Sequence, residues 1–280
     1  MKRLKLIALP FSFALLFSQL GCANLEAIRE FASISSESAQ YTHLVDDYAQ
    51  SPSRQKSFQP AGMGERLDKM AAEREAQRPE LLALHTLISE YMDSLGQLAA
   101  DDLVVFDSEI DLLGKELADR KILSSRQGDA YAEIARLLTT MAADRWRKRQ
   151  LKKLIEKSNA DFQIVTGALK DIVRKDFRRS IENEEIAAAK YYDGKIAEAK
   201  ATPPQQAGIA ALEELRDKRV AGIHSKIEAV DAYTEILEKI AQGHQTLYDQ
   251  RNALSRKDLI QEVKRDSKTL RKLYKKLREL

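Results

Sequence analysis

Residues 220–244, VAGIHSKIEAVDAYTEILEKIAQGH, carry the clearest structural signal in the chain. Val220, Ile227 and Thr234 recur every seven residues. A second row follows at an offset of three residues and consists of Ile223, Val230, Leu237 and His244. Two such rows share one face of an α-helix, as the a and d positions of a seam that packs along a partner. The stretch therefore predicts one long helix over about 205–251.

The same spacing extends outward through most of the chain, and no segment keeps the two-residue alternation of a β-strand. The predicted helices cover about 24–49, 65–117, 126–157, 160–199, 205–251 and 256–280. A helix of about 40 residues is roughly 60 Å long, and such helices pack most easily side by side. The predicted fold is all-α, an elongated antiparallel helical bundle with coiled-coil-like heptad seams.

Helix-breaking residues predict where the bundle turns. Ser51, Pro52 and Ser53 predict the end of the first helix, followed by a polar linker over about 50–64. Further breaks, kinks or helix ends are predicted at Pro79, at Ser158 with Asn159, and at Pro203 with Pro204.

Composition excludes several classes of protein. The 280 residues hold 46 Lys+Arg and 43 Asp+Glu, a net charge of +3. Lys2, Arg3 and Lys5 account for this excess, so the rest of the chain is neutral and its overall charge is not that of a nucleic-acid-binding protein. Only one cysteine is present, which excludes an intramolecular disulfide and a multi-cysteine zinc site.

The first residues have the pattern of an export signal. Residues 1–5 are basic, residues 6–17 are apolar, and Cys22 follows Gly21 shortly afterwards. This arrangement resembles the lipobox of bacterial lipoproteins, although Gln19 occupies the place where that family usually has leucine. The resemblance implies a signal peptide over 1–21 and a diacylated Cys22 that becomes the new N-terminus.

The residue after the cysteine bears on localisation. In the lipoprotein family an aspartate there signals retention in the inner membrane of enteric bacteria, whereas this chain has Ala23. The resemblance therefore implies an outer-membrane lipoprotein that faces the periplasm. Two alternatives are ordinary signal cleavage after Ala23 and an uncleaved membrane anchor.

The chain shows no catalytic or metal-binding motif, and no cofactor is predicted. None of the four histidines lies in an H-E-x-x-H or Glu-x-x-His pattern, and no phosphate-binding glycine loop or nucleophile elbow is present. The four are His43, His85, His224 and His244. His244 continues a core row, and we expect it near a fraying end of the bundle, with its ring edge hydrogen-bonded or wet.

Two basic clusters are the remaining candidates for a binding site. Residues 145–153 hold six cations around Trp146, which we expect to be partly buried among them. Residues 256–280 net +6, whereas 22–255 net −6. The predicted contacts with an anionic partner are Arg145, Arg147, Lys148, Arg149, Lys268, Arg271, Lys272, Lys275 and Lys276. The alternative is a solvated polar face opposite the leucine seam.

Together these features predict a single helical-bundle domain over 22–280 that is tethered to a membrane through acylated Cys22. The predicted function is that of a non-catalytic structural or protein-interaction element of the cell envelope. Its expected partners are an envelope protein, the anionic cell wall or a second copy of the chain, and not nucleic acid. The alternatives are a binding bundle of chaperone, inhibitor or immunity type and, more remotely, an enzyme with a histidine–carboxylate site.

Overall fold

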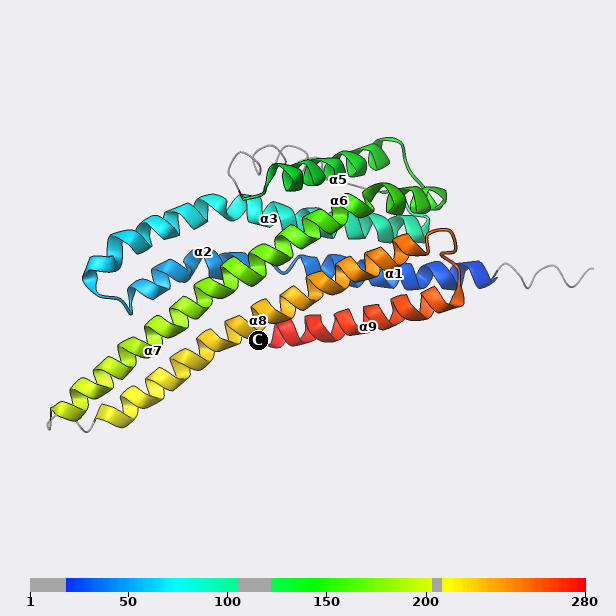
Figure 1. Ribbon diagram of the computed structural model, residues 1–280. Coiled ribbons are helices and arrows are strands. Elements are labelled where there is room, and N and C mark those ends of the chain that lie inside the picture. The colour runs from blue at the N-terminus through cyan, green and yellow to red at the C-terminus, as the bar shows by residue number, and fades with distance from the viewer. Residues whose placement is uncertain (1–18, 105–121, 203–207) are drawn as a thin grey trace, which may run out of the picture.

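The computed structural model describes residues 19–104, 122–202 and 208–280, and within them it contains helices and no strand (Figure 1). The α-helices are α1 (Gln19–Ala39), α2 (His43–Lys56), α3 (Gly64–Ala100), α5 (Ser125–Ala143), α6 (Leu151–Ile172), α7 (Arg178–Ala201), α8 (Ile209–Asp249) and α9 (Lys257–Glu279). The predicted all-α bundle is confirmed. The heptad seams remain a prediction.

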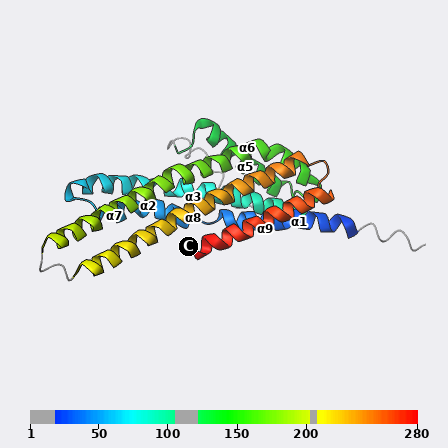
Figure 2. The same ribbon diagram turned by 60° about the horizontal axis from the view of Figure 1, so that its bottom comes forward.

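The helices lie roughly along one axis, as Figures 1 and 2 show. One turn of π-helix, Val173–Phe177, joins α6 to α7 without interruption. The antiparallel α7 and α8 project beyond the rest of the bundle at the end opposite the start of α1. Within the described ranges no helix is both long and apolar enough to cross a membrane.

Helix α8 confirms the prediction from its sequence and has 41 residues. The buried stripe on α8 is wider than the two predicted rows, because Tyr233, Ile236 and Ile240 are also buried. A stripe of this width contacts several helices, and α8 packs against α1, α6, α7 and α9. The core is therefore that of a multi-helix bundle.

The predicted break at Ser51–Pro52–Ser53 is wrong, because α2 continues through Pro52 to Lys56 and the linker over 50–64 begins later than expected. Proline has no N–H to donate to the carbonyl four residues earlier, which here belongs to Tyr48. The guanidinium of Arg74 donates to that carbonyl at 2.9 Å. A tertiary contact thus replaces the lost helical hydrogen bond. The break instead falls at residues 40–42, between α1 and α2.

The third predicted helix is also divided differently. It ends at Ala143, and Arg145 then adopts a left-handed conformation with φ 48° before α6 begins at Leu151. No break occurs at Ser158 and Asn159, because both side chains are buried within α6 and hydrogen-bond there. Pro79 lies inside α3 and does not restart it. The part of the predicted 65–117 seam from residue 105 onward lies outside the described residues.

Candidate functional site

Helix α9 packs with one side against α1 and α8. Its apolar side chains Leu259, Val263, Leu270 and Leu277 are buried against these two helices. Ser267 lies between them and donates its hydroxyl hydrogen to the Val263 carbonyl at 2.8 Å. Because only two helices cover α9, the rest of its circumference is open to solvent, and Figure 2 shows α9 at the near edge of the bundle.

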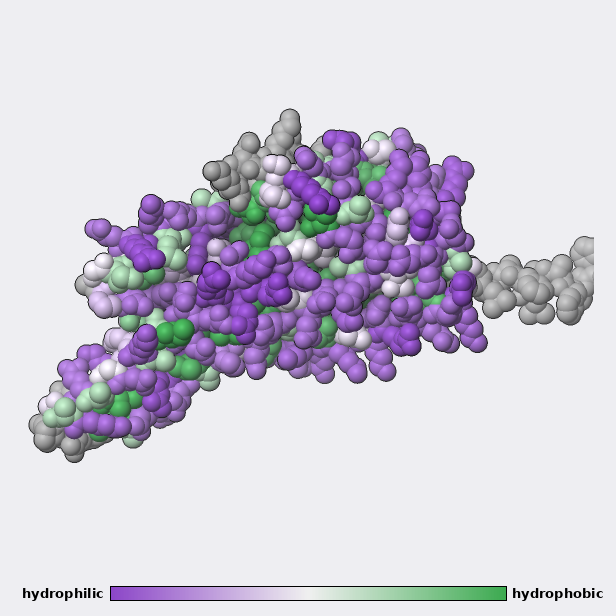
Figure 3. Space-filling model, in the orientation of Figure 1, coloured by the Kyte–Doolittle hydropathy of each residue, from purple (hydrophilic) through white to green (hydrophobic). Residues whose placement is uncertain are grey.

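Most of the exposed residues of α9 are basic, and hydrophilic side chains cover the lower edge of the molecule in Figure 3. We call the basic surface of α9 the cationic face, and it consists of the exposed residues Lys257, Lys264, Arg265, Lys268, Arg271, Lys272, Lys275, Lys276 and Arg278. At 100° per residue they span about 160° of the helix circumference. Residues 267–278 contain six cations and no acid. The structure thus gathers the five predicted contacts from Lys268 to Lys276 on one surface.

Acidic partners neutralise only part of the cationic face. Arg271 lies 3.5 Å from Glu30 of α1, and Lys275 lies 3.8 Å from Glu279. Among the residues that the structure describes, no ion pair involves Lys264, Lys268 or Lys272. Like charges four residues apart on a helix each cost about 0.2–0.5 kcal/mol. The face therefore reduces the stability of α9.

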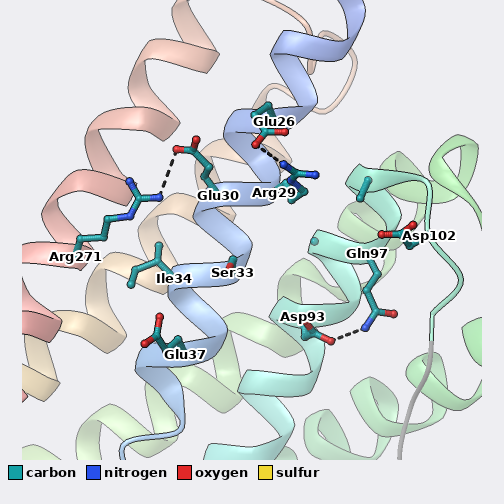
Figure 4. A pocket seen from close by; sticks show the side chains of 12 residues that line it. Glu26, Arg29, Glu30, Ser33, Ile34, Glu37, Asp93, Gln97, Asp102 and Arg271 are labelled. Atoms are coloured by element: carbon teal, nitrogen blue, oxygen red, sulfur yellow. Dashed lines mark hydrogen bonds and ion pairs between the residues drawn. The ribbon is translucent and has the colours of Figure 1, made fainter.

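A polar groove of about 480 Å³ borders this surface, between α1 and α3, with Arg271 at its rim (Figure 4). Its acidic lining residues are Glu26, Glu30, Glu37, Asp93 and Asp102. Three of them are engaged in ways that Figure 4 marks, since Glu26 pairs with Arg29, Glu30 pairs with Arg271, and Asp93 accepts a hydrogen bond from Gln97. Throughout the described ranges, no group of three or more His, Cys, Asp and Glu side chains could hold a metal ion.

The second predicted basic cluster lies between α5 and α6. Arg145, Arg147 and Arg149 are exposed there, and Lys148 is partly buried. Arg147 donates to the Asp101 carbonyl at 3.0 Å, and the Lys148 backbone N–H donates to the Asp101 carboxylate at 3.1 Å. This cluster is therefore partly engaged in holding the α5–α6 connection against the end of α3.

Trp146 within this cluster is more deeply buried than predicted. Its exposed fraction is 4%, and the Nζ of Lys153 lies 4.8 Å from the centre of the ring. The indole joins the hydrophobic core and is covered by the lysine, so it is not available as an exposed contact for a partner.

Both basic clusters begin at the same end of the bundle. The start of α9, the α5–α6 connection and the start of α1 lie together there in Figures 1 and 2. Cys22, the predicted lipidation site, belongs to the first turn of α1. The sequence alone did not indicate that residues near positions 22, 147 and 257 would share one end.

His85 of α3 caps the C-terminal end of α1 together with Tyr233 of α8. The His85 Nδ1 lies 3.1 Å from the Ala39 carbonyl and 2.8 Å from the Tyr233 hydroxyl, which itself donates to that carbonyl at 3.0 Å. The carbonyl can only accept, so Nδ1 carries the proton. Burial lowers the pKa of His85 to about 4, and the Ala39 hydrogen bond opposes this decrease.

His244 of α8 lies inside the core, so its predicted position near a fraying end is wrong, whereas its ring is hydrogen-bonded as one of the two predicted states had it. Its Nδ1 donates to Asn159 Oδ1 at 2.9 Å, and its Nε2 accepts from the Tyr91 hydroxyl at 2.6 Å. Burial lowers the pKa of His244 to about 3. The row position of His244 predicted its burial, but no sequence signal identified Tyr91 or Asn159 as its partners.

The other two histidines lie at the surface. His43 packs its ring 5.4 Å from Tyr41, and the Nδ1 of His224 lies 3.0 Å from Glu185. His85 and His244 thus serve separate hydrogen-bond networks. His224 and Glu185 line a surface groove together with Asp193, Asp217 and Glu228. The remote enzyme alternative stays a prediction.

Comparison of the chain with protein-family models, with curated proteins and with solved structures finds no match in any of the three.

Proposed function

We propose that this chain is a lipid-anchored, non-catalytic protein of the bacterial cell envelope, and that the cationic face of α9 binds an anionic partner. The observation that carries the proposal is the face itself, nine exposed cations on one helix with few acids against them. Such a surface costs folding stability, so a binding role explains it better than solubility does.

The leader supports the location. Acylation of Cys22 would tether the end of the bundle where α1 begins, because Cys22 lies in the first turn of that helix. The lipobox resemblance and Ala23 favour the outer membrane, with the bundle facing the periplasm. Several acyl chains hold a protein firmly, since each buried CH₂ contributes about 0.8 kcal/mol.

Metabolic labelling with radioactive palmitate tests the anchor. The parent chain should incorporate label and fractionate with membranes, whereas Cys22→Ser should do neither. The matched control is Ser38→Ala, a buried substitution in the same helix that leaves the leader intact. Equal labelling of parent and Cys22→Ser, or no labelling of the parent, would refute the anchor.

A further inference from the structure

We propose that the cationic face of α9 lies on an anionic phospholipid bilayer, the same membrane that holds the acyl group. The inference rests on the proposed function and names the partner of its binding surface. The protein would then contact the membrane in two ways, through the acyl group at Cys22 and through the cations along α9. Membrane proteins commonly combine one acyl signal with a polybasic surface in this way.

The direction of α9 places its basic residues correctly for such a contact. Helices α1 and α9 start at the same end of the bundle and run in the same direction, as Figure 1 shows. The pair Glu30–Arg271 follows this parallel order, and Glu37 and Tyr274, further along the two helices, line one surface groove. The cationic face therefore begins beside the tether and extends away from it for about 34 Å of helix.

The outer position of α9 leaves this face free to meet a flat surface. The helix packs only on α1 and α8 among the described elements with substantial contacts, and it forms one edge of the bundle in Figures 1 and 2. A bundle lying on this edge would bring the start of α1 close to the same plane. The acyl group and the lysines would then reach one bilayer together.

The chemistry of the face favours lipid headgroups over an acidic protein. Six of its nine cations are lysines, which are depleted at protein–protein interfaces. The one aromatic side chain on the outer part of this helix, Tyr274, is partly buried. Protein-binding sites depend on aromatic and arginine anchors in shaped pockets, whereas a fluid layer of phosphates requires only a broad area of mobile cations.

The acidic residues of α9 lie beside this face or at its two ends. Asp266 lies toward α8, where burial raises the pKa of its carboxyl group and Lys239 opposes the increase. Asp258 pairs with Arg256 at 2.6 Å at the start of the helix. Glu279 is the one acid within the arc of the cationic face, at its far end. A bilayer would therefore meet positive charge along nearly the whole helix.

A fluorescent probe on the face tests the contact with the acylated full chain. Cys22 is the only cysteine, so once it is acylated a thiol probe labels only an introduced one. Gln261→Cys places the probe on the face, and Thr140→Cys places it on α5, at the far side of the bundle (Figure 1). Each protein is reconstituted into phosphatidylcholine vesicles with and without roughly 30% phosphatidylglycerol, containing lipids that carry a nitroxide quencher at the headgroup.

We expect quenching at position 261 to be about threefold stronger in the anionic vesicles than in neutral ones, and to fall to the neutral level in about 0.5 M salt. The probe at 140 should show no such difference. Equal quenching at 261 in both vesicles, or equal gains at 261 and 140, would overturn the inference while leaving the anchor intact. If the protein floats with anionic vesicles but not with neutral ones, the cationic face binds lipid and the acyl anchor is refuted. If it floats with neither kind of vesicle, both the lipid contact of the face and the acyl anchor are refuted.

Charge reversal separates the face from the net charge of the chain. Lys264→Glu, Lys268→Glu and Lys275→Glu together should abolish the extra quenching. The matched control reverses three exposed lysines on other helices, namely Lys157, Lys190 and Lys218. If this control abolishes the quenching equally, the bilayer is not the partner of the cationic face. The same conclusion follows if α9 crosslinks to an acidic protein while the probe at position 261 stays unquenched. Circular dichroism checks that both variants keep the parent's helix content.

Discussion

His85 and His244 both connect α3 to α8 through a tyrosine, but the groups that hold the two rings differ. At His85 the shared acceptor is the backbone carbonyl at the end of α1, and the buried Nε2 has no hydrogen-bond partner within the described residues. At His244 both nitrogens are hydrogen-bonded, and every partner is a side chain. The His85 site joins α1, α3 and α8 through the main chain of α1. The His244 site joins α3, α6 and α8 through the side chains of Tyr91 and Asn159.

The orientation of the rings follows from these partners. His85 stacks on Tyr233, with ring centres 5.3 Å apart and planes 11° apart. His244 meets Tyr91 edge-on at the same distance, with planes 63° apart. The stacked His85 ring leaves its Nε2 without a hydrogen-bond partner within the described residues, whereas the edge-on His244 ring has a polar partner at each nitrogen. The two sites thus show that a buried histidine can be neutral with or without a full set of partners.

Acid gives the largest expected effect on this pair. The folded-state pKa values of His85 and His244 are both below the ordinary 6.5. Below pH 6.5 the unfolded chain therefore binds more protons than the folded chain. The free energy of unfolding decreases as the pH falls. Between pH 6.5 and 4 each histidine should remove roughly 3 kcal/mol of stability. Below pH 4 the loss should continue for His244 alone, down to about pH 3.

Urea denaturation at several pH values measures this loss. His85→Gln and His244→Gln should each flatten the curve, and His244→Gln should flatten it at the more acidic end. Proton NMR of the two imidazole rings gives an independent readout in the folded parent. Ring signals that shift with an ordinary midpoint near pH 6.5 would contradict the neutral, buried state of both histidines.

Packing beside His244 gives the next effect. A Cβ added at Gly243 would overlap the Phe31 ring, whereas one added at Gly96 would lie 3.3 Å from the Ala32 Cβ. Because Phe31 is fully buried, Gly243→Ala should cost roughly 3 kcal/mol of unfolding free energy, and Gly96→Ala should cost much less. Thermal denaturation compares the two variants. The double variant with Phe31→Leu should recover part of the loss, and additive costs would contradict a direct clash.

The two tyrosine hydroxyls give the smallest effect and compare the sites most directly. Tyr91→Phe removes the donor to His244 Nε2 and should cost roughly 2 kcal/mol, because a buried acceptor loses its partner. Tyr233→Phe should cost roughly 1 kcal/mol, because His85 still donates to the Ala39 carbonyl. Chemical denaturation at pH 7 measures both. Equal costs would contradict this difference between the sites, and the reverse order would show that the backbone acceptor loses more when its tyrosine donor is removed.

Hydrophobic spacing predicted the helices with long uninterrupted stripes, and α8 and α9 are the clearest examples. The errors occurred where a distant residue overrides a local signal. Pro52 does not end α2, because Arg74 binds the freed carbonyl of Tyr48. Ser158 does not cap a helix, because its side chain is buried beside the Tyr91 hydroxyl at 2.6 Å.

The candidate site was partly predictable for the same reason. The basic residues of α9 follow one another in the sequence, so their common face was visible in the helical period. The meeting of that helix with the start of α1 was not visible, because it joins residues about 240 positions apart. Neither histidine network could be assembled from local spacing, since the partners of each ring come from separate helices.

The pairing of α1 with α9 also constrains how the chain reaches its folded state. Synthesis delivers α1 first and α9 last, so the part of α1 that α3 does not cover stays open until nearly all of the protein has been made. Contacts between segments so far apart in the chain form slowly, because a very long loop must close first. Removal of α9 would therefore expose the strip of α1 that only the last helix covers.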